Sequence, residues 1–324
     1  MNPQVGVVLE HQSLPLEETL QRAELVDDLG AASTWLVQLP NQRESSTVLA
    51  GMACRTSRCT VGSAILPIYS RPPVVMAHTA LTLDELSGGR FILGLGLGHR
   101  GVGEWMVGAG AVPPAVPAMR EYLLITISLI RDGEVTHDGK WFSGHAYYAS
   151  DVARRPTLPV HVGGFGPKMV ELAAELADGV ILWMCTPGYI RDHAMPALRK
   201  GWARRVDGRY PDGKGFQVTA MVNAAVTSDL AGDLEWFRQF LTAHLRVPAY
   251  QRLFTASGFD DQVQAGRGDR AMTRALALIG RPEDLQRQMA AYLAAGTTHI
   301  AIAPVASAHT DTACFLQTVR GGLG

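Results

Sequence analysis

The segments with the clearest chemical potential are rich in glycine, and each follows a short apolar run. Gly94–Gly101 has glycine at almost every second position, which lets backbone amides approach a flat or phosphorylated ligand. Gly163–Met169 places glycines before Pro167, and proline favours the first turn of a helix. Free amides at the amino terminus of a helix bind anions, so this segment predicts a phosphate site, to which Lys168 adds charge if it points inward. Gly62–Pro73 indicates only that something packs closely at the end of a strand.

Each of the first two segments also has alternative interpretations. Gly96–Gly101 fits the pattern G-x-G-x-x-G, which in dinucleotide-binding folds lies at a strand-to-helix turn. Here the pattern follows the fourth apolar run, and a non-helical stretch with Pro113, Pro114 and Pro117 comes next. A dinucleotide-binding fold is therefore disfavoured. A tight loop without a ligand remains the alternative for this segment, as does a bare strand-to-helix turn for Gly163–Met169.

Histidines are the candidates for proton transfer near neutral pH. His11 follows the first apolar run and His99 the fourth, which places both at the carboxyl ends of expected strands. His78 falls within a helical pattern, and His161 lies in a strand, where alternation decides whether it faces inward. H-E-x-x-H, paired metal-ligand spacings and G-x-S-x-G are all absent from the sequence, so metal-dependent hydrolysis and serine acyl transfer have no support and no metal site is expected.

The composition excludes several kinds of partner. The 324 residues carry a formal net charge of −1, so no basic field attracts nucleic acid or an anionic membrane. No apolar run reaches the roughly 20 residues of a membrane span, and no signal peptide is evident, so a cytoplasmic protein is expected. The four cysteines, Cys54, Cys59, Cys185 and Cys314, form neither a zinc spacing nor a disulfide framework. Only 18% of residues are charged, which indicates that much surface is covered by a subunit interface or by helices on both faces of a sheet.

Short apolar runs alternate with helical patterns along the whole chain, which is typical of repeated strand–helix units. The expected strands are Val5–Leu9, Thr34–Val37, Thr60–Leu66, Arg90–Leu95, Pro159–Gly163, Gly179–Trp183, Phe216–Val226 and Thr298–Ala303. The expected helices are Leu16–Leu29, Ser46–Cys54, Val74–Leu86, Ala118–Ile130, Pro167–Leu176, Tyr189–Arg205 and Pro282–Ala294. This order predicts an α/β fold, a closed (β/α)₈ TIM barrel formed as one domain by residues 1–324; an open doubly wound sheet gives the same local pattern.

Two stretches interrupt this alternation. Glu134–Asp151 contains the pair Asp138-Gly139 between apolar residues, which predicts a β-hairpin. Phe237–Thr273 is longer than a strand-to-helix loop requires, and we expect it to be a lid or a substrate-side insertion on the catalytic face of the barrel.

Several motifs in the same order resemble the luciferase-like oxidoreductase superfamily, above all its deazaflavin (coenzyme F420)-dependent branch, to which methylene-tetrahydromethanopterin reductase belongs. The resemblance covers nearly the whole chain. The motifs that carry it are Tyr69–Pro73 with His78-Thr79-Ala80, Leu83–Gly96, Gly166–Met169 with Leu172-Ala173, Ala177–Val180, and Gly280–Asp284 with Ala295-Gly296.

The resemblance implies a luciferase-like (β/α)₈ barrel, a homodimer, and a cofactor ring at the carboxyl ends of the strands. It also implies a non-prolyl cis peptide behind the ring, at Ala64–Ile65 in this sequence, and a phosphate-binding loop at Gly163–Lys168. The residues implied in cofactor binding are Gln38, Ala64, Ile65, Gly96, Gly98, Gly163, Gly164, Phe165, Gly166, Pro167, Lys168, Met184 and Cys185. His11 and His99 are the candidate catalytic residues.

The sequence departs from the family pattern at two positions. Many members have an acidic residue and a histidine after the second strand, where this chain has Gln38-Leu39. The sugar-phosphate dehydrogenase branch has a glutamate where His99 stands. Both departures argue against that dehydrogenase activity and leave the proton donor open.

The predicted function is hydride transfer between coenzyme F420 and a small organic substrate. The alternatives are an FMN-dependent monooxygenase and a flavin- or deazaflavin-binding protein with little turnover. The substrate pocket is expected among loops around His11, Trp35, Trp105, Trp141 and the Phe237–Thr273 insertion.

Overall fold

Parallel strands close into a barrel in the computed structural model, which describes residues 4–9, 14–39, 41–98, 100–108, 112–150, 154–305 and 307–324. Within these residues, eight strands pair in a ring, and pairing of β9 with β10 completes it. In ring order they are β1 (Gln4–Leu9), β2 (Ser33–Leu36), β3 (Thr60–Ser63), β5 (Phe91–Gly96), β8 (Val160–Gly163), β9 (Gly179–Trp183), β10 (Gln217–Val226) and β12 (His299–Pro304). The predicted closed barrel is confirmed, and the open sheet is excluded.

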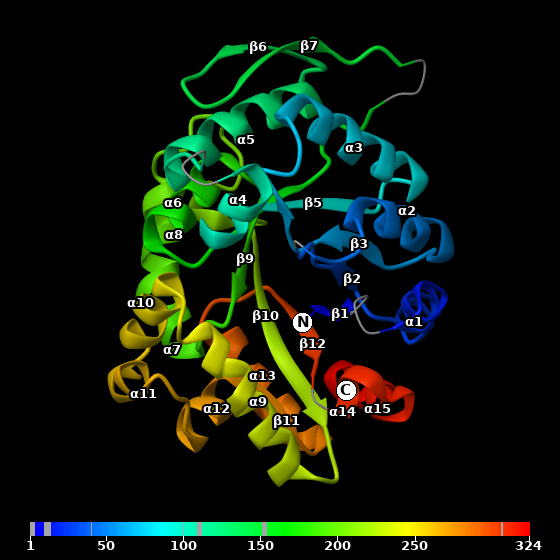
Figure 1. Ribbon diagram of the computed structural model, residues 1–324. Helices are drawn as coiled ribbons and strands as arrows, with labels where there is room; N and C mark the ends of the chain where they lie inside the picture. The colour runs from blue at the N-terminus through cyan, green and yellow to red at the C-terminus, as the bar shows by residue number, and fades with distance from the viewer. Residues whose placement is uncertain are drawn as a thin grey trace.

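Helices cover the outside of this ring (Figure 1). They include α1 (Leu16–Asp28), α2 (Ser45–Arg55), α3 (Pro73–Leu86), α5 (Ala115–Arg131), α6 (Pro167–Leu176), α8 (Met195–Trp202), α13 (Pro282–Ala294) and α15 (Thr312–Leu323). The short helices α4 (Arg100–Val107), α7 (Pro187–Tyr189) and α14 (Ser307–Thr310) come after the carboxyl ends of β5, β9 and β12. Proline begins α3, α6 and α13, where its missing N–H and fixed φ suit the first turn. Among the described residues, none of the helices has the length and apolar character that crossing a bilayer would require.

The strands carry two separate cores, because successive side chains point to opposite faces. One core lies between the sheet and the helices, and a smaller one fills the barrel lumen. Trp35 on β2 is fully buried in the lumen, and the absence of a Cβ on Gly62 makes room for its ring. We expected Trp35 in a substrate-pocket loop; that expectation is wrong, because alternation along β2 turns its ring into the lumen.

Two short strands modify the barrel wall. β4 (Leu66–Pro67) pairs with β5 after the chain leaves β3, so the expected strand Thr60–Leu66 is interrupted at Ala64-Ile65. β11 (Ala277–Gly280) extends the sheet beside the carboxyl half of β10, and the sequence reasoning did not predict it.

The predicted hairpin is confirmed as β6 (Glu134–Asp138) and β7 (Ser143–Tyr147), paired antiparallel. It lies over α5, which separates it from the barrel (Figure 1). The carboxylate of Glu121 on α5 accepts hydrogen bonds from the backbone amides of Lys140, Trp141 and Phe142. These bonds hold Trp141 against the helical layer, so the expectation that it lines the substrate pocket is wrong.

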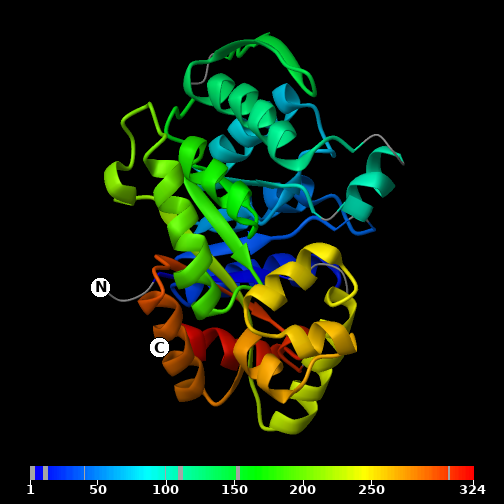
Figure 2. The ribbon, with the colours of Figure 1, turned by 90° about the vertical axis from the view of Figure 1, so that its left-hand side faces the viewer.

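The insertion expected as a lid is helical rather than a loop. It consists of α9 (Leu230–His244), α10 (Pro248–Ala256), α11 (Asp260–Ala265) and α12 (Arg270–Leu276). Buried Phe237, Leu241, Phe254 and Met272 give it a core continuous with that of the barrel helices. Figure 2 shows α10 on the side toward which the strand ends point.

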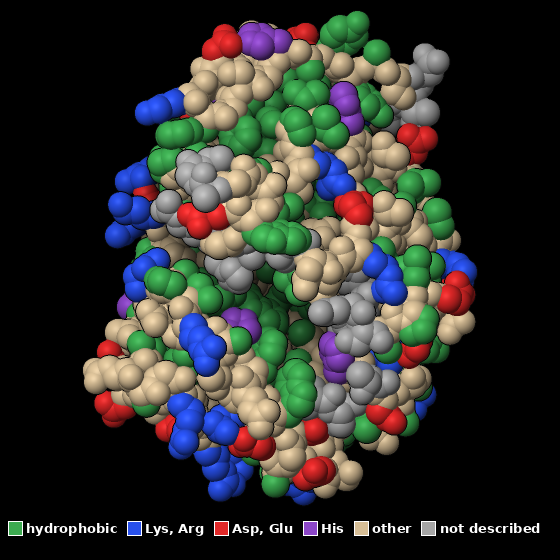
Figure 3. Space-filling model, in the orientation of Figure 1, with side chains coloured by type: hydrophobic (Ala, Val, Ile, Leu, Met, Phe, Trp, Pro, Cys, Tyr) green, Lys and Arg blue, Asp and Glu red, His purple; other side chains and the backbone are tan. Residues whose placement is uncertain are grey.

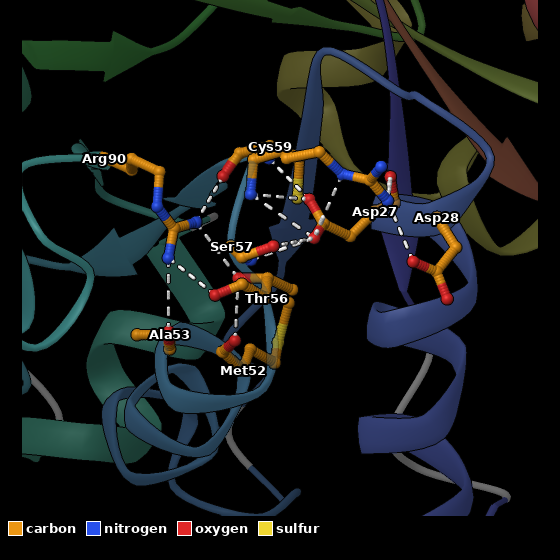
Figure 4. A network of polar contacts seen from close by, with 9 residues as sticks. Asp27, Asp28, Met52, Ala53, Thr56, Ser57, Cys59 and Arg90 are labelled. Carbon is orange, nitrogen blue, oxygen red and sulfur yellow. Dashed lines mark hydrogen bonds and ion pairs between the residues drawn. The ribbon is translucent and has the colours of Figure 1, made fainter.

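The amino ends of β3 and β5 are joined by a dense polar network (Figure 4). The buried carboxylate of Asp27 accepts from the backbone amides of Ser57, Arg58 and Cys59. Although burial alone would raise the pKa of Asp27, these bonds lower it to about 2. The guanidinium of Arg90 donates to the carbonyls of Ala53, Thr56 and Cys59, where its charge also suits the carboxyl end of α2.

Candidate functional site

The opposite, carboxyl end of the barrel faces the viewer in Figure 3, and it is hollowed near its centre, where hydrophobic side chains are exposed. The predicted cofactor-binding residues all end or follow strands whose carboxyl ends lie there: β2, β3, β5, β8 and β9. Two of the connections are bonded to each other, since the amide of Gln38 donates to the carbonyl of Ile65 at 3.3 Å. The structure therefore brings the predicted residues to one end of the barrel.

The half-buried Ile65 side chain lies between β3, β5 and β8 at the carboxyl end of the lumen, and we call its surface the Ile65 floor. The peptide bond between Ala64 and Ile65 is cis, as the family resemblance implied. A Cβ placed on Gly96 would lie 2.6 Å from Cγ1 of Ile65, and one on Gly163 would overlap Cγ2. Only glycine fits at these two positions, because the Ile65 side chain occupies the space that a larger residue would need. The floor is therefore apolar, and neither Gly96 nor Gly163 adds a side chain beside it.

Three lumen side chains, Val37, Ile65 and Trp183, are only half-buried, whereas the cluster that they pack against is buried. They mark the level at which the lumen opens to the outside. Sequence reasoning missed Trp183. Alternation was the available signal, because Gly179, Ile181 and Trp183 fall on one face of β9.

The amino terminus of α6 lies beside this floor and has no side-chain cap. Gly166 is the N-cap, a Cβ on it would meet open space, and the Lys168 side chain is exposed. The preceding turn is held firmly, because the Gly164 amide donates to Ile181 and the Phe165 carbonyl accepts from the Tyr189 hydroxyl at 2.9 Å. Burial raises the pKa of Tyr189, which keeps its hydroxyl protonated as a donor. The site thus presents helix amides and a lysine on a fixed turn, which suits an anion.

The loop after β2 is braced by its own side chains. The Gln38 side-chain oxygen accepts from the amide of Ser45, and its nitrogen donates to the carbonyl of Leu39. Glu44 caps α2 and accepts from Arg71, which follows β4. Burial opposes ionisation of Glu44, but bonds from Arg71, Ser46 and Thr47 lower its pKa to about 2. The Gln38 amide therefore shapes the loop.

The residues after β9 have unequal roles. Cys185 is buried, its thiol donates to the carbonyl of Trp183, and burial raises its pKa, so it is a packed thiol rather than a nucleophile. Met184 has a φ of 58°, in the left-handed region that non-glycine residues rarely adopt. Its sulfur accepts from Nδ2 of Asn223 at 3.4 Å. Asn223 was also missed, although an amide in the middle of the apolar strand β10 was a visible signal.

Two other histidines are buried deeper in the lumen. His161 and His299 lie beside Trp35, and the Ser33 hydroxyl bonds to Nε2 of His299 at 2.8 Å. Burial lowers the pKa of both rings to about 4, so both are neutral at physiological pH. His161 thus faces inward, but it is sealed from the hollow.

The candidate catalytic residues His11 and His99 lie outside the described residues. Trp105 on α4 is 65% exposed. In the described part of the chain, no group of three or more potential ligands could hold a metal ion.

Comparison with known proteins gives a consistent result. A family model described as luciferase-like monooxygenase matches residues 3–299. A provisionally assigned coenzyme F420-dependent oxidoreductase of Mycobacterium tuberculosis is 27% identical over 294 residues, which cover 80% of this chain and 83% of that protein. A 5,10-methylenetetrahydromethanopterin reductase of Methanolobus tindarius is 26% identical over 306 residues, covering 88% and 90%.

Solved structures share the fold. The coenzyme F420-dependent tetrahydromethanopterin reductase from Methanopyrus kandleri superposes with a TM-score of 0.80 at 20% identity, over 99% of this chain and 98% of that one. A Pseudomonas putida diketocamphane monooxygenase component in complex with FMN superposes with a TM-score of 0.72 at 15% identity, over 99% and 96%.

Proposed function

The chain belongs to the luciferase-like monooxygenase family of oxidoreductases, and from that membership we propose that it uses coenzyme F420 to exchange a hydride with a small organic substrate. The observation that carries the choice of cofactor is the pair of relatives matched over most of their length, whose names specify coenzyme F420 or a reductase of the same branch. FMN, which a structural relative contains, is the alternative cofactor.

The residues present fit such a cofactor. A planar ring needs an apolar surface, and Ile65 supplies one, because Gly96 and Gly163 have no side chains and leave room for the Ile65 side chain beside their backbones. A phosphate needs donors and positive charge, and the uncapped α6 terminus with Lys168 supplies both. The two features stand on adjoining segments, since Gly163 ends β8 and Pro167 begins α6.

When bound, the deazaflavin supplies a ring carbon that accepts or donates a hydride. The protein's own contribution is to position the cofactor ring and the substrate and to exclude water from them. The ring would lie on an apolar surface formed by Trp183, Val37 and Ile65. Electrostatic interactions are stronger there than in water. Tyr189 keeps the Gly163–Gly166 turn in place through the Phe165 carbonyl. His11 and His99 remain the predicted proton donors or acceptors.

A binding titration tests this proposal. Purified protein is titrated with coenzyme F420 and, separately, with FMN, and the fluorescence of each cofactor is followed. We expect saturable binding of coenzyme F420 at micromolar concentrations and weaker binding of FMN. Saturable binding of FMN alone would contradict the proposal and favour the monooxygenase. Tight binding of coenzyme F420 without oxidation or reduction of any partner would favour the binding protein with little turnover.

A further inference from the structure

The turn at Gly163–Gly166, which leads into α6, carries a single side chain. Its other residues are glycines, and Phe165 is the exception. Glycine loses more conformational freedom on folding than any other residue, so a turn of this composition needs contacts that hold it in one conformation. The Phe165 carbonyl is held by the Tyr189 hydroxyl, and the Phe165 ring is half-buried. That ring is therefore the part of the turn that another side chain can hold by packing.

The Phe165 ring packs against the α9–α12 insertion. Its partner is Tyr250 on α10, with ring centroids 5.2 Å apart and an interplanar angle of 38°. α10 lies on the side of the barrel toward which the strand ends point (Figure 2). The contact therefore joins the insertion to the turn before α6, although the two segments are far apart in the sequence.

The Tyr250 ring is held in turn by other aromatic rings of the insertion. The His244 ring on α9 meets it nearly at a right angle, with centroids 4.9 Å apart, and Phe254 stacks on it at 6.0 Å. His244 continues a row of rings along one face of α9, because Phe240 contacts His244 at 4.6 Å and Trp236 contacts Phe240 at 5.6 Å. Tyr250 is thus fixed by the insertion and can act as a support for Phe165.

We propose that Tyr250 is a positioning residue for the cofactor phosphate, because its ring fixes Phe165 and thereby the turn that presents the free amides of α6. This inference rests on the phosphate-binding part of the proposed function. It gives the insertion, which we expected to be a lid or a substrate-side element, a role in cofactor binding. Donors that are already in place bind an anion more tightly, since binding does not have to order them.

The test measures affinity by fluorescence titration for two pairs of ligands that differ in phosphate. One pair is coenzyme F420 and its phosphate-free deazaflavin core, and the other is FMN and riboflavin. Tyr250→Leu removes the ring that Phe165 contacts, so affinity for the phosphorylated ligand should fall about fivefold, the effect of one aromatic pair. Affinity for the phosphate-free ligand should stay at the wild-type value. Tyr250→Phe keeps the ring and should bind all these ligands as the wild type does.

Phe240→Leu is the matched control. Phe240 is a half-buried ring of the same insertion, and its ring partners include His244 but not Phe165. Its substitution should leave affinity for both members of each pair close to wild type. Tm is measured for every variant without ligands, so that a loss of stability is separated from a loss of affinity.

The outcomes separate this inference from the proposal on which it rests. Failure of the wild type to bind coenzyme F420 overturns the proposed function, and FMN and riboflavin then test Tyr250. A wild type that binds neither pair, or binds both members of a pair equally, overturns the phosphate site and this inference with it. No loss in Tyr250→Leu, an equal loss for the phosphate-free ligand, or an equal loss in Phe240→Leu overturns the role of Tyr250. An equal loss in Tyr250→Phe assigns the effect to the hydroxyl and overturns the ring contact as its cause.

Discussion

The two ends of the barrel differ in whether their polar groups are hydrogen-bonded within the protein. At the amino end, Asp27 and Arg90 bond backbone groups of neighbouring segments (Figure 4). At the carboxyl end, the α6 terminus is uncapped and Asn223 keeps an unused acceptor. This difference supports the proposal that ligands bind at the carboxyl end, which carries the active site in this architecture, while the amino end contributes to stability. Substitutions at the amino end should therefore change the stability of the fold, and substitutions at the carboxyl end should change the affinity for the cofactor.

The largest expected effect is at the amino end. Asp27→Ala leaves three backbone amides without their acceptor, so the free energy of unfolding should fall by about 3 kcal/mol. Urea unfolding measures the change. Asp28→Ala is the matched control, because the Asp28 side chain is 76% exposed and its ion pair is with exposed Arg58, and it should cost less than about 0.5 kcal/mol. Equal decreases in the free energy of unfolding of the two variants would show that the buried network stabilises the fold no more than an exposed ion pair does.

The buried histidines predict a pH effect on stability. The folded protein binds protons at His161 and His299 only near pH 4, whereas an unfolded chain binds them near 6.5. Stability is therefore full above pH 6.5 and is lost as pH falls from 6.5 to 4. At pH 5 each histidine should cost about 2 kcal/mol relative to pH 7.5. Unfolding at both pH values should show a smaller decrease in His299→Gln; an equal decrease would mean that other groups cause it.

At the carboxyl end, adding one methyl group at Gly96 should weaken cofactor binding. Gly96→Ala forces Ile65 to move, because the new Cβ would lie 2.6 Å from its Cγ1. We expect affinity for coenzyme F420 to fall about tenfold or more. Gly101→Ala meets open space and is the control, with affinity close to wild type. Fluorescence titration gives both values, and equal affinities in the two variants would exclude the Ile65 floor from the site.

The smallest effect concerns charge at the α6 terminus. Lys168 is exposed, so its attraction for a phosphate is screened by water and salt. Lys168→Ala should weaken binding of coenzyme F420 about threefold in low salt, and the difference should vanish near 1 M salt. Lys200→Ala, an exposed lysine on α8, should leave affinity unchanged at both salt concentrations.

The parts of the fold that were predictable are those in which local signals agree. Gly179–Trp183, Pro167–Leu176 and Pro282–Ala294 were predicted with correct bounds, because continuous apolar runs mark covered strands and proline marks helix starts. The helices of the Phe237–Thr273 insertion were missed because its glycine and charge obscured a weak apolar periodicity. β11 was missed because a four-residue strand carries little pattern.

The candidate site was predictable only in part. Gly96, Gly163 and Lys168 were found because glycine loops and a helix start are visible along the chain. Glycine is required at Gly96 and Gly163 because the Ile65 side chain lies against both. This contact joins three strands that come together only in the folded protein. Trp35 was misplaced, since a strand's register decides which of its residues face the lumen.

Amide hydrogen exchange with and without saturating coenzyme F420 tests the central claim most directly, because it reports protection along the whole chain. We predict slower exchange at residues 163–168 and 96–98, with no change at 57–59. Protection centred instead on the amino end, for example on the hollow lined by Arg199, Trp202 and Lys214, would contradict the assignment of the cofactor to the carboxyl end of the barrel.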